Sequence, residues 1–148
     1  MVKLNEIYKC EVCGNIVELV HVGGGELVCC GQPMKVQSEK SGEEGMEKHK
    51  PIIEKTEDGN TVIKVGSIDH PMEKEHYIQW IEAFVGNKVL RKYLFPGEKP
   101  EMNLCGCGDN CKCGSDCSCG TEVTSARAYC NKHGLWKSQW GWKSHEQR

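Results

Sequence analysis

The sequence lacks several features that would place it in a common functional class. No apolar run approaches the ~20 residues that a membrane-spanning helix requires, and the opening MVKLNEIYKC has no apolar core of the kind found in secretory signals. The formal net charge is −2, so the basic surplus of a nucleic-acid-binding protein is missing. No stretch predicts a helix of normal length, and only 38% of residues are apolar. We therefore expect a cytoplasmic, mostly β protein that binds neither nucleic acid nor membrane.

Cysteine is abundant by contrast, with 11 among 148 residues. In a reducing cytosol, clustered cysteines are more often metal ligands than disulfides. The odd count would also leave one thiol over in a complete disulfide framework. Metal binding is thus the first chemistry that the composition indicates.

Changes in composition along the chain predict two domains, residues 1–37 and residues 38–148. The first is too small to fold by burial alone and needs a staple. Within it, strands Ile16–Val22 and Glu26–Val28 are predicted to form a hairpin around a Gly-Gly-Gly turn. A polar stretch from Gln37 to Lys48 is interpreted as a solvated connection to the second domain.

The second domain is predicted to be a β-sandwich or barrel, because short β-type runs recur between turn signals. These runs are TVIKVGSI, HYIQWIEAFV, VLRKYLF and a final strand at about Glu122–Tyr129. A cysteine-rich insertion at about residues 103–120 interrupts the pattern. The polar tail KSQWGWKSHEQR receives no structural assignment.

The first candidate metal site consists of two cysteine pairs in the small domain. Cys10-x2-Cys13 is followed, after 15 residues, by the adjacent pair Cys29-Cys30. Four thiolates suit zinc or iron, and the alternatives are a plain structural zinc ribbon or a vicinal disulfide between Cys29 and Cys30. Neighbours on a strand point to opposite faces, so the adjacent pair can reach one metal only if the backbone bends.

The second candidate site combines histidines with one late cysteine. Cys130-x2-His133 has a spacing that lets both side chains reach one metal around a turn. Three further histidines, His49, His70 and His76, occur in GMEKHKPI and SIDHPMEKEHYIQW. Taken singly, each has the commoner alternative of a surface or hydrogen-bonded core histidine.

Together these motifs resemble a known family. YKCEVCGN…GGGELVCCGQPM is similar to desulforedoxin, a small domain with a distorted iron centre of four cysteine ligands. EKHKP, HPMEKEHYIQWIE and YCNKHGLWK resemble the catalytic domain of superoxide reductase, and the two domains in this order resemble desulfoferrodoxin, the two-iron form.

The resemblance implies a fold, an activity and a set of ligands. The second domain would be an immunoglobulin-like β-sandwich with one non-haem iron. Its activity would be one-electron reduction of superoxide to hydrogen peroxide, a detoxification that counters oxidative stress, with re-reduction by a rubredoxin-like donor. A homodimer is also implied. The ligands carried over by position are Cys10, Cys13, Cys29 and Cys30 for the first iron, and His49, His70, His76, His133 and axial Cys130 for the second.

Two charged residues precede the first histidine ligand in the motif EKH. A solvated charge pair in a loop is the usual interpretation of such residues. The resemblance instead implies catalytic roles. Lys48 would steer the superoxide anion and hold the protonating water, and Glu47 would fill the sixth iron position, which five protein ligands leave open, in the oxidised resting state.

Six further cysteines lie in NLCGCGDNCKCGSDCSCG, which resembles a metallothionein segment and is absent from the family pattern. Soft thiolates favour zinc or copper, and the alternative is a metal-free insertion. These residues are Cys105, Cys107, Cys111, Cys113, Cys117 and Cys119. Two other functions stay open from the sequence: a non-catalytic protein for electron transport or metal handling, and superoxide dismutation.

Overall fold

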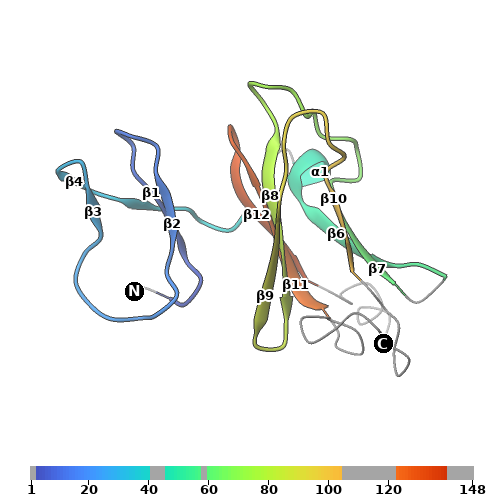
Figure 1. Cartoon of the computed structure of the whole chain (residues 1–148), viewed down its shortest axis with the longest axis horizontal. Coiled ribbons are helices and arrows are strands. Elements are labelled where there is room, and N and C mark those ends of the chain that lie inside the picture. Colours follow the sequence, from blue (N-terminus) through green and yellow to red (C-terminus); the bar gives the residue numbers. More distant parts are fainter. Residues whose placement is uncertain (1–2, 41–45, 58–59, 105–122, 140–148) are drawn as a thin grey trace. The chain divides into compact units, whose positions relative to one another are not determined.

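The computed structural model describes residues 3–40, 46–57, 60–104 and 123–139. The chain divides into two compact units, Met1–Ser38 and Glu39–Arg148. Among the described residues, none of the helical structure is long and apolar enough to cross a lipid bilayer. Strands dominate both units, as the sequence predicts (Figure 1).

The first unit contains two small antiparallel sheets. One has the strand order β2-β1-β5 and the other pairs β3 with β4. The strands are β1 (Ile7–Lys9), β2 (Ile16–Glu18), β3 (Val28–Cys29), β4 (Gln32–Pro33) and β5 (Lys35–Val36).

The prediction of a hairpin around the Gly-Gly-Gly turn at residues 23–25 is wrong. β2 pairs with β1 and β3 pairs with β4, so the two predicted partners do not pair with each other. The tight turns instead carry the cysteines: Cys10 and Cys13 lie between β1 and β2, and Cys29 ends β3, with Cys30 in the turn to β4. The short turns that bring the four cysteines together set the pairing here, because turn geometry fixes hairpin register.

The second unit is a β-sandwich of a three-stranded and a four-stranded sheet (Figure 1). The first has the order β10-β7-β6 and the second β12-β11-β8-β9, and every pairing is antiparallel. The elements are α1 (Met46–His49), β6 (Pro51–Lys55), β7 (Thr61–Val65), β8 (Ile78–Val85), β9 (Lys88–Tyr93), β10 (Glu101–Leu104), β11 (Val123–Cys130) and β12 (Gly134–Gln139).

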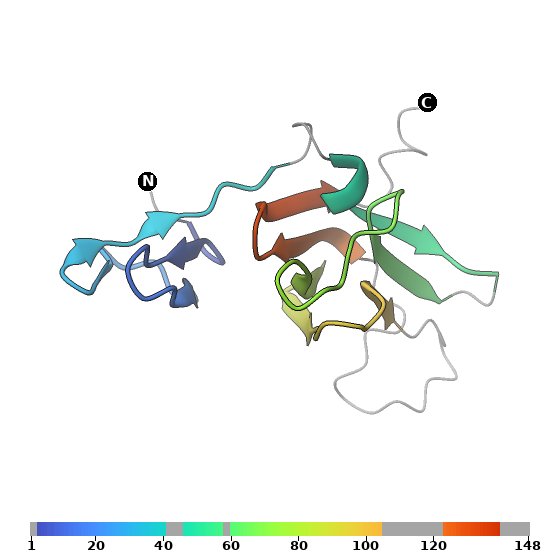
Figure 2. The ribbon, with the colours of Figure 1, turned by 90° about the horizontal axis from the view of Figure 1, so that it is seen from above.

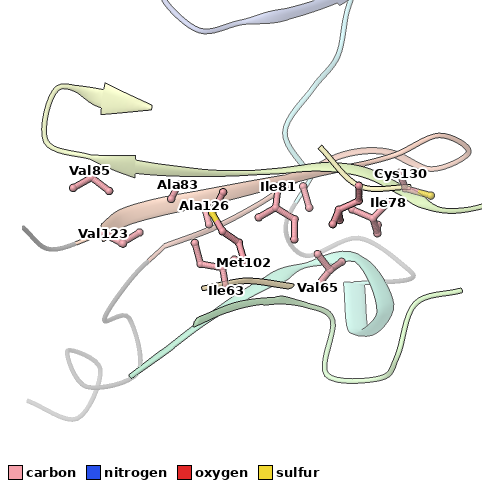
Figure 3. Packing of buried hydrophobic residues seen from close by; sticks show 12 residues of the cluster. Ile63, Val65, Ile78, Ile81, Ala83, Val85, Met102, Val123, Ala126 and Cys130 are labelled. Carbon is pink, nitrogen blue, oxygen red and sulfur yellow. The ribbon is translucent and has the colours of Figure 1, made fainter. Parts of the chain in front are cut away.

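The core of this unit lies between the two sheets (Figure 3). Alternation in β8 sends Ile81, Ala83 and Val85 into the core, while Glu82 points to the opposite face. Ile63 of β7 meets them from the facing sheet. Burial of each large aliphatic side chain contributes about 1.5–3 kcal/mol, so this sandwich is stabilised by its core.

Most strands of the sandwich were predictable, and three were not. β7, β8, β9 and β11 lie in the predicted β-type runs, whereas β6, β10 and β12 do not. β10 also includes Asn103 and Leu104, which the sequence assigned to the insertion. β12 takes in residues 137–139 of the supposed tail, because backbone pairing with β11 extends it where hydrophobicity does not.

The linker prediction also needs correction. Residues 46–49 form the helical turn α1, and Lys40 forms a bridge to Trp136 of β12. The expected solvated connection is therefore fixed to the second unit at both of its described segments. In Figure 2 the hairpin of β11 and β12, in red, lies next to α1, in teal.

Candidate metal centres

The four cysteines of the first unit converge. Their Sγ atoms all lie within 4.8 Å of one another. Cys10 N–H donates to the Asn15 carbonyl at 2.8 Å, which closes a tight turn through Cys13. Cys30 has a φ of +54°, and Gly31 follows with +76°. The backbone therefore bends at the adjacent pair, as the sequence required for two neighbouring thiols to share one metal.

Hydrogen bonds within the group shift the pKa values of Cys10 and Cys29 in opposite directions. Hydrogen bonding, first from the Cys13 backbone N–H, lowers the pKa of Cys10 to about 6. Hydrogen bonding to the Cys13 side chain raises the pKa of Cys29 to about 12. Cys29 therefore stays protonated near pH 7 unless a cation binds. All four are free cysteines, with 3.9 Å between the sulfurs of Cys29 and Cys30, so this arrangement fits a metal and excludes the vicinal disulfide.

A second group forms in the sandwich from residues that lie far apart in the sequence. His49 ends α1, His70 and His76 lie between β7 and β8, Cys130 ends β11 and His133 precedes β12. One ligand atom of each lies within 4.8 Å of the others. His49, His70 and Cys130 are buried, whereas His133 is exposed, so the group opens to the surface on the His133 side.

The four imidazoles form an approximately square set. Centroids of neighbouring rings are 4.6 Å apart for His49–His70, 4.7 Å for His70–His76, 4.9 Å for His76–His133 and 4.6 Å for His133–His49. The diagonal from His49 to His76 is longer, at 6.4 Å. A tetrahedral set would have equal separations. The rings therefore resemble an equatorial belt, beside which the Cys130 sulfur lies 3.6 Å from His133 Nδ1.

Two of these histidines have ring nitrogens that are ready to bind a metal. Among the described residues, Nε2 of His70 and Nε2 of His76 are buried and have no hydrogen-bond partner. His70 Nδ1 lies 2.7 Å from the Pro71 carbonyl, which can only accept, so Nδ1 carries the proton and Nε2 is left as a ligand. Burial lowers the pKa of His70 to about 4 and also lowers that of His76, so both rings are neutral near pH 7.

The thiol of Cys130 needs a cation in order to ionise. Burial raises its pKa above the ordinary value, opposed by backbone N–H groups of Lys132 and His133 that point at the sulfur. A bound metal deprotonates a coordinating thiol. The donor set of this group, with its unpartnered ring nitrogens, therefore fits a transition-metal ion.

Backbone contacts hold the histidine-bearing segments together, and these contacts could not be predicted from residue types. The Glu47 carbonyl accepts from Ser67 N–H at 2.8 Å and from Ile68 N–H at 3.0 Å. Gly66 has a φ of +82°, and a Cβ there would lie 2.7 Å from the Lys48 carbonyl. This close approach fixes α1 against the loop that leads to His70.

Asn131 plays the same part for His76. Its Oδ1 accepts from Tyr77 N–H at 3.0 Å, and its Nδ2 donates to the Glu75 carbonyl at 3.0 Å. The side chain thus bridges the residues on either side of His76. The signal that could have found it is its position between the ligands Cys130 and His133.

The remaining predicted residues differ in what the structure says of them. Glu47 and Lys48 lie in α1, directly before His49, and both are exposed. The six cysteines of the insertion, Cys105, Cys107, Cys111, Cys113, Cys117 and Cys119, lie outside the described residues.

Comparison with known proteins agrees with this two-part layout. Residues 3–36 match the family model "Desulfoferrodoxin, N-terminal domain", and residues 41–139 match the model "Desulfoferrodoxin". A desulfoferrodoxin homolog of Archaeoglobus fulgidus is 50% identical over 139 residues, covering 93% of this chain and 99% of the relative.

Two further relatives extend the comparison. A protein of Methanocaldococcus jannaschii, described as a candidate superoxide reductase, is 34% identical over 66% of this chain and 84% of its own length. The crystal structure of the superoxide reductase from Treponema pallidum has the same fold, with a TM-score of 0.65 and 23% identity, over 90% of this chain and 96% of that one. The family models cover most of the chain and both cysteine- and histidine-bearing regions, so the chain belongs to the desulfoferrodoxin family.

Proposed function

We propose that this protein is a superoxide reductase, a non-haem iron enzyme that converts superoxide to hydrogen peroxide by one-electron reduction. One observation carries the proposal: four imidazoles in an approximately square set and one thiol converge within 4.8 Å at a site that opens on the His133 side. The relative from Methanocaldococcus jannaschii, named above, supports the same activity. The residues proposed to hold the catalytic iron are His49, His70, His76, His133 and Cys130.

The donor set is better suited to iron than to a structural zinc ion. Structural zinc sites are closed and tetrahedral, with four ligands. Four nitrogens in a belt and one sulfur make five donors, which leaves one position of an octahedron without a protein ligand. When bound, reduced iron would supply the electron and the open position at which superoxide reacts.

Lys48 is proposed to serve the substrate and its protons. Its side chain is exposed, and Lys48 directly precedes the proposed ligand His49 in the sequence. An ammonium at the mouth of a site raises the local concentration of a small anion, even though the whole chain carries a net charge of −2. From Nζ, or through a water that Nζ holds, it can also deliver a proton.

Glu47 is proposed to close the open position between turnovers. It is exposed in α1, and its own carbonyl is held by Ser67 and Ile68, so its backbone is fixed while its carboxylate faces solvent. A hard carboxylate oxygen suits an oxidised iron better than a reduced one. This residue would therefore act on the resting state and have little part in substrate capture.

The first unit is proposed to hold a second iron through Cys10, Cys13, Cys29 and Cys30. Four protein ligands leave such a metal no open position, so its chemistry would be limited to electron transfer. In this proposal residues 1–37 form the electron-transfer domain and residues 38–148 the catalytic one.

The remaining parts of the proposal concern partners and setting. They are a rubredoxin-like electron donor, a homodimer, a cytoplasmic location, and zinc or copper bound by the cysteines of the insertion. Each is supported by the family resemblance or by the donor chemistry of thiolates.

The decisive experiment is a single-turnover reaction on the full-length, anaerobically reduced protein. We expect two irons per chain, stoichiometric oxidation of the histidine-ligated iron on addition of superoxide, and formation of hydrogen peroxide without oxygen. Zinc alone, or no response to superoxide, would contradict the proposal and favour an electron carrier. Evolution of oxygen would indicate a dismutase instead.

A further inference from the structure

Lys40 lies next to the turn that carries two of the proposed ligands, Cys130 and His133. Its backbone N–H donates to the Leu135 carbonyl at 2.9 Å, and its carbonyl accepts from Lys137 N–H at 2.8 Å. β12 is an edge strand of the four-stranded sheet, so Lys40 adds a one-residue extension to that edge. The backbone at residue 40 is therefore fixed beside the second metal centre.

The side chain of Lys40 reaches the ligand turn itself. Its Nζ donates to the His133 carbonyl at 2.8 Å, and Trp136 Nε1 donates to the same oxygen at 3.2 Å. The ammonium also lies 5.6 Å from the centroid of the Trp136 ring. A charge-assisted bond of this length is stronger than a neutral one, so Lys40 restrains the peptide that joins His133 to Gly134.

Through Trp136 the contact extends to a second ligand. The indole stacks on the His49 ring with a centroid distance of 5.0 Å and an interplanar angle of 15°. Lys40 thus touches the peptide of one ligand and the ring that packs on another. His133 is the exposed ligand of the set, so packing fixes it least and a hydrogen bond to its peptide matters most.

The residue before Lys40 is anchored as well. Buried Arg127 anchors Glu39 through an ion pair at 3.1 Å, whereas the pair of Glu39 with Lys137, at 3.5 Å, lies at the surface and contributes little. Arg127 is buried and pairs in turn with the buried carboxylate of Glu82 at 2.8 Å. These ion pairs connect Glu39 to the middle of β8. They hold the neighbouring Lys40 in position whether or not a metal is bound.

We propose that Lys40 is a positioning residue of the second metal centre: its ammonium holds the His133 peptide and the Trp136 indole in the orientation that metal binding needs. The identity of the metal as iron rests on the proposed function. Lys40 lies between the two regions that match family models, 3–36 and 41–139, so neither match assigns it a role.

The test measures how well the full-length, iron-loaded protein keeps its metal. Lys40→Met removes the charge and the donor but keeps an apolar stem over Trp136. We expect a chelator to extract iron from the histidine centre on the order of tenfold faster than in the wild type, as for other groups that orient metal ligands. The readouts are the cysteine-to-iron absorption band of that centre, for both its position and its rate of decay, and the band of the four-cysteine centre as an internal reference.

Three variants make the result specific. Lys40→Arg keeps the charge and donors and should restore retention close to that of the wild type. Lys137→Met removes a neighbouring lysine that contacts the same Glu39, and should leave retention unchanged. Trp136→Phe removes the second donor to the His133 carbonyl but keeps a ring against His49, and should speed iron loss to a smaller degree.

Two outcomes would overturn the proposal. One is equal retention in Lys40→Met and Lys137→Met. The other is a loss in Lys40→Met that Lys40→Arg does not restore and that a lowered melting temperature of the metal-free protein accounts for. A wild-type protein that binds iron but does not consume superoxide would remove the proposed function, yet the difference between Lys40→Met and Lys137→Met would still stand.

Discussion

The two candidate metal centres are built in opposite ways. The first unit has almost no core of its own, since only Ile7, Tyr8 and the proposed ligand Cys10 are buried among its described residues. In the second unit the ligands are attached to a β-sandwich that has its own cluster of buried apolar side chains. We therefore expect the first unit to need its metal in order to fold, and the second unit to fold without one.

The largest expected effect comes from removing the first metal. Cys10→Ser, or full chelation, should unfold the first unit and leave the second folded. Structural metal sites of this kind supply roughly 10–16 kcal/mol of folding free energy, more than a core of this size can provide. Amide hydrogen exchange measured for each unit separately checks this. Protection that persists in residues 7–36 without metal would remove the contrast between the units.

The matching change in the second unit should affect chemistry and leave the fold intact. Cys130→Ser removes the only sulfur of that centre among the described residues but fits the same buried space. We expect superoxide consumption to fall by more than the ~10–100-fold typical of outer-shell partners. The melting temperature of the sandwich should change little. A collapse of the sandwich would show that this metal, too, is structural.

Gly66 tests how closely the fold of the second unit is coupled to its site. Gly66→Ala would combine a positive φ with a Cβ 2.7 Å from the Lys48 carbonyl. Gly97→Ala is the matched control, because its φ is +95° but nothing lies within 4 Å of the added Cβ. We expect the control to cost about 1–2 kcal/mol and Gly66→Ala to cost a further 1–3 kcal/mol or so from overpacking. Urea unfolding measures both, and equal costs would refute the close approach.

Acid should weaken the metal-free sandwich through its buried histidines. Burial lowers the pKa of His70 from 6.5 to about 4. Between these values the unfolded chain binds a proton that the folded chain does not, so the free energy of unfolding falls as pH falls through this window. We expect a loss of roughly 1–3 kcal/mol. Urea midpoints from pH 7 to pH 4 measure it, and His70→Gln should flatten the slope. An identical slope in that variant would assign the effect to other groups.

The smallest effect is expected at Lys48, because it acts through solvent. Lys48→Ala should slow the second-order reaction with superoxide by up to about tenfold at low salt and weaken its salt dependence. Stopped-flow rates at two ionic strengths measure this. Lys64→Ala is the control, since Lys64 is exposed on β7 and pairs with Glu54. An unchanged rate at low salt would count against steering.

The sequence was most informative where residue type and spacing carry the chemistry. The paired cysteines of the first group and the Cys130-x2-His133 pair were recognisable from their spacing, whereas His49, His70 and His76 were assigned as ligands only through the family resemblance. Four strands of the sandwich were predictable for a different reason, because each lies in a short β-type run between turn signals. Prediction from the sequence failed at β6, β10 and β12, because backbone pairing and not the side-chain pattern forms these strands.

By itself, then, the sequence determined a four-cysteine set and the Cys130-x2-His133 pair, and the family resemblance added three histidines to that pair. Tertiary structure alone decided how they are held. The square of imidazoles joins segments that are up to 84 positions apart, from His49 to His133. The contacts that fix them fall on backbone carbonyls, at Glu47, Glu75 and His133, and every residue has such a carbonyl. The partner of a side chain therefore cannot be predicted from the sequence when that partner is a peptide group. Only the folded chain shows that Lys40 donates to the His133 carbonyl.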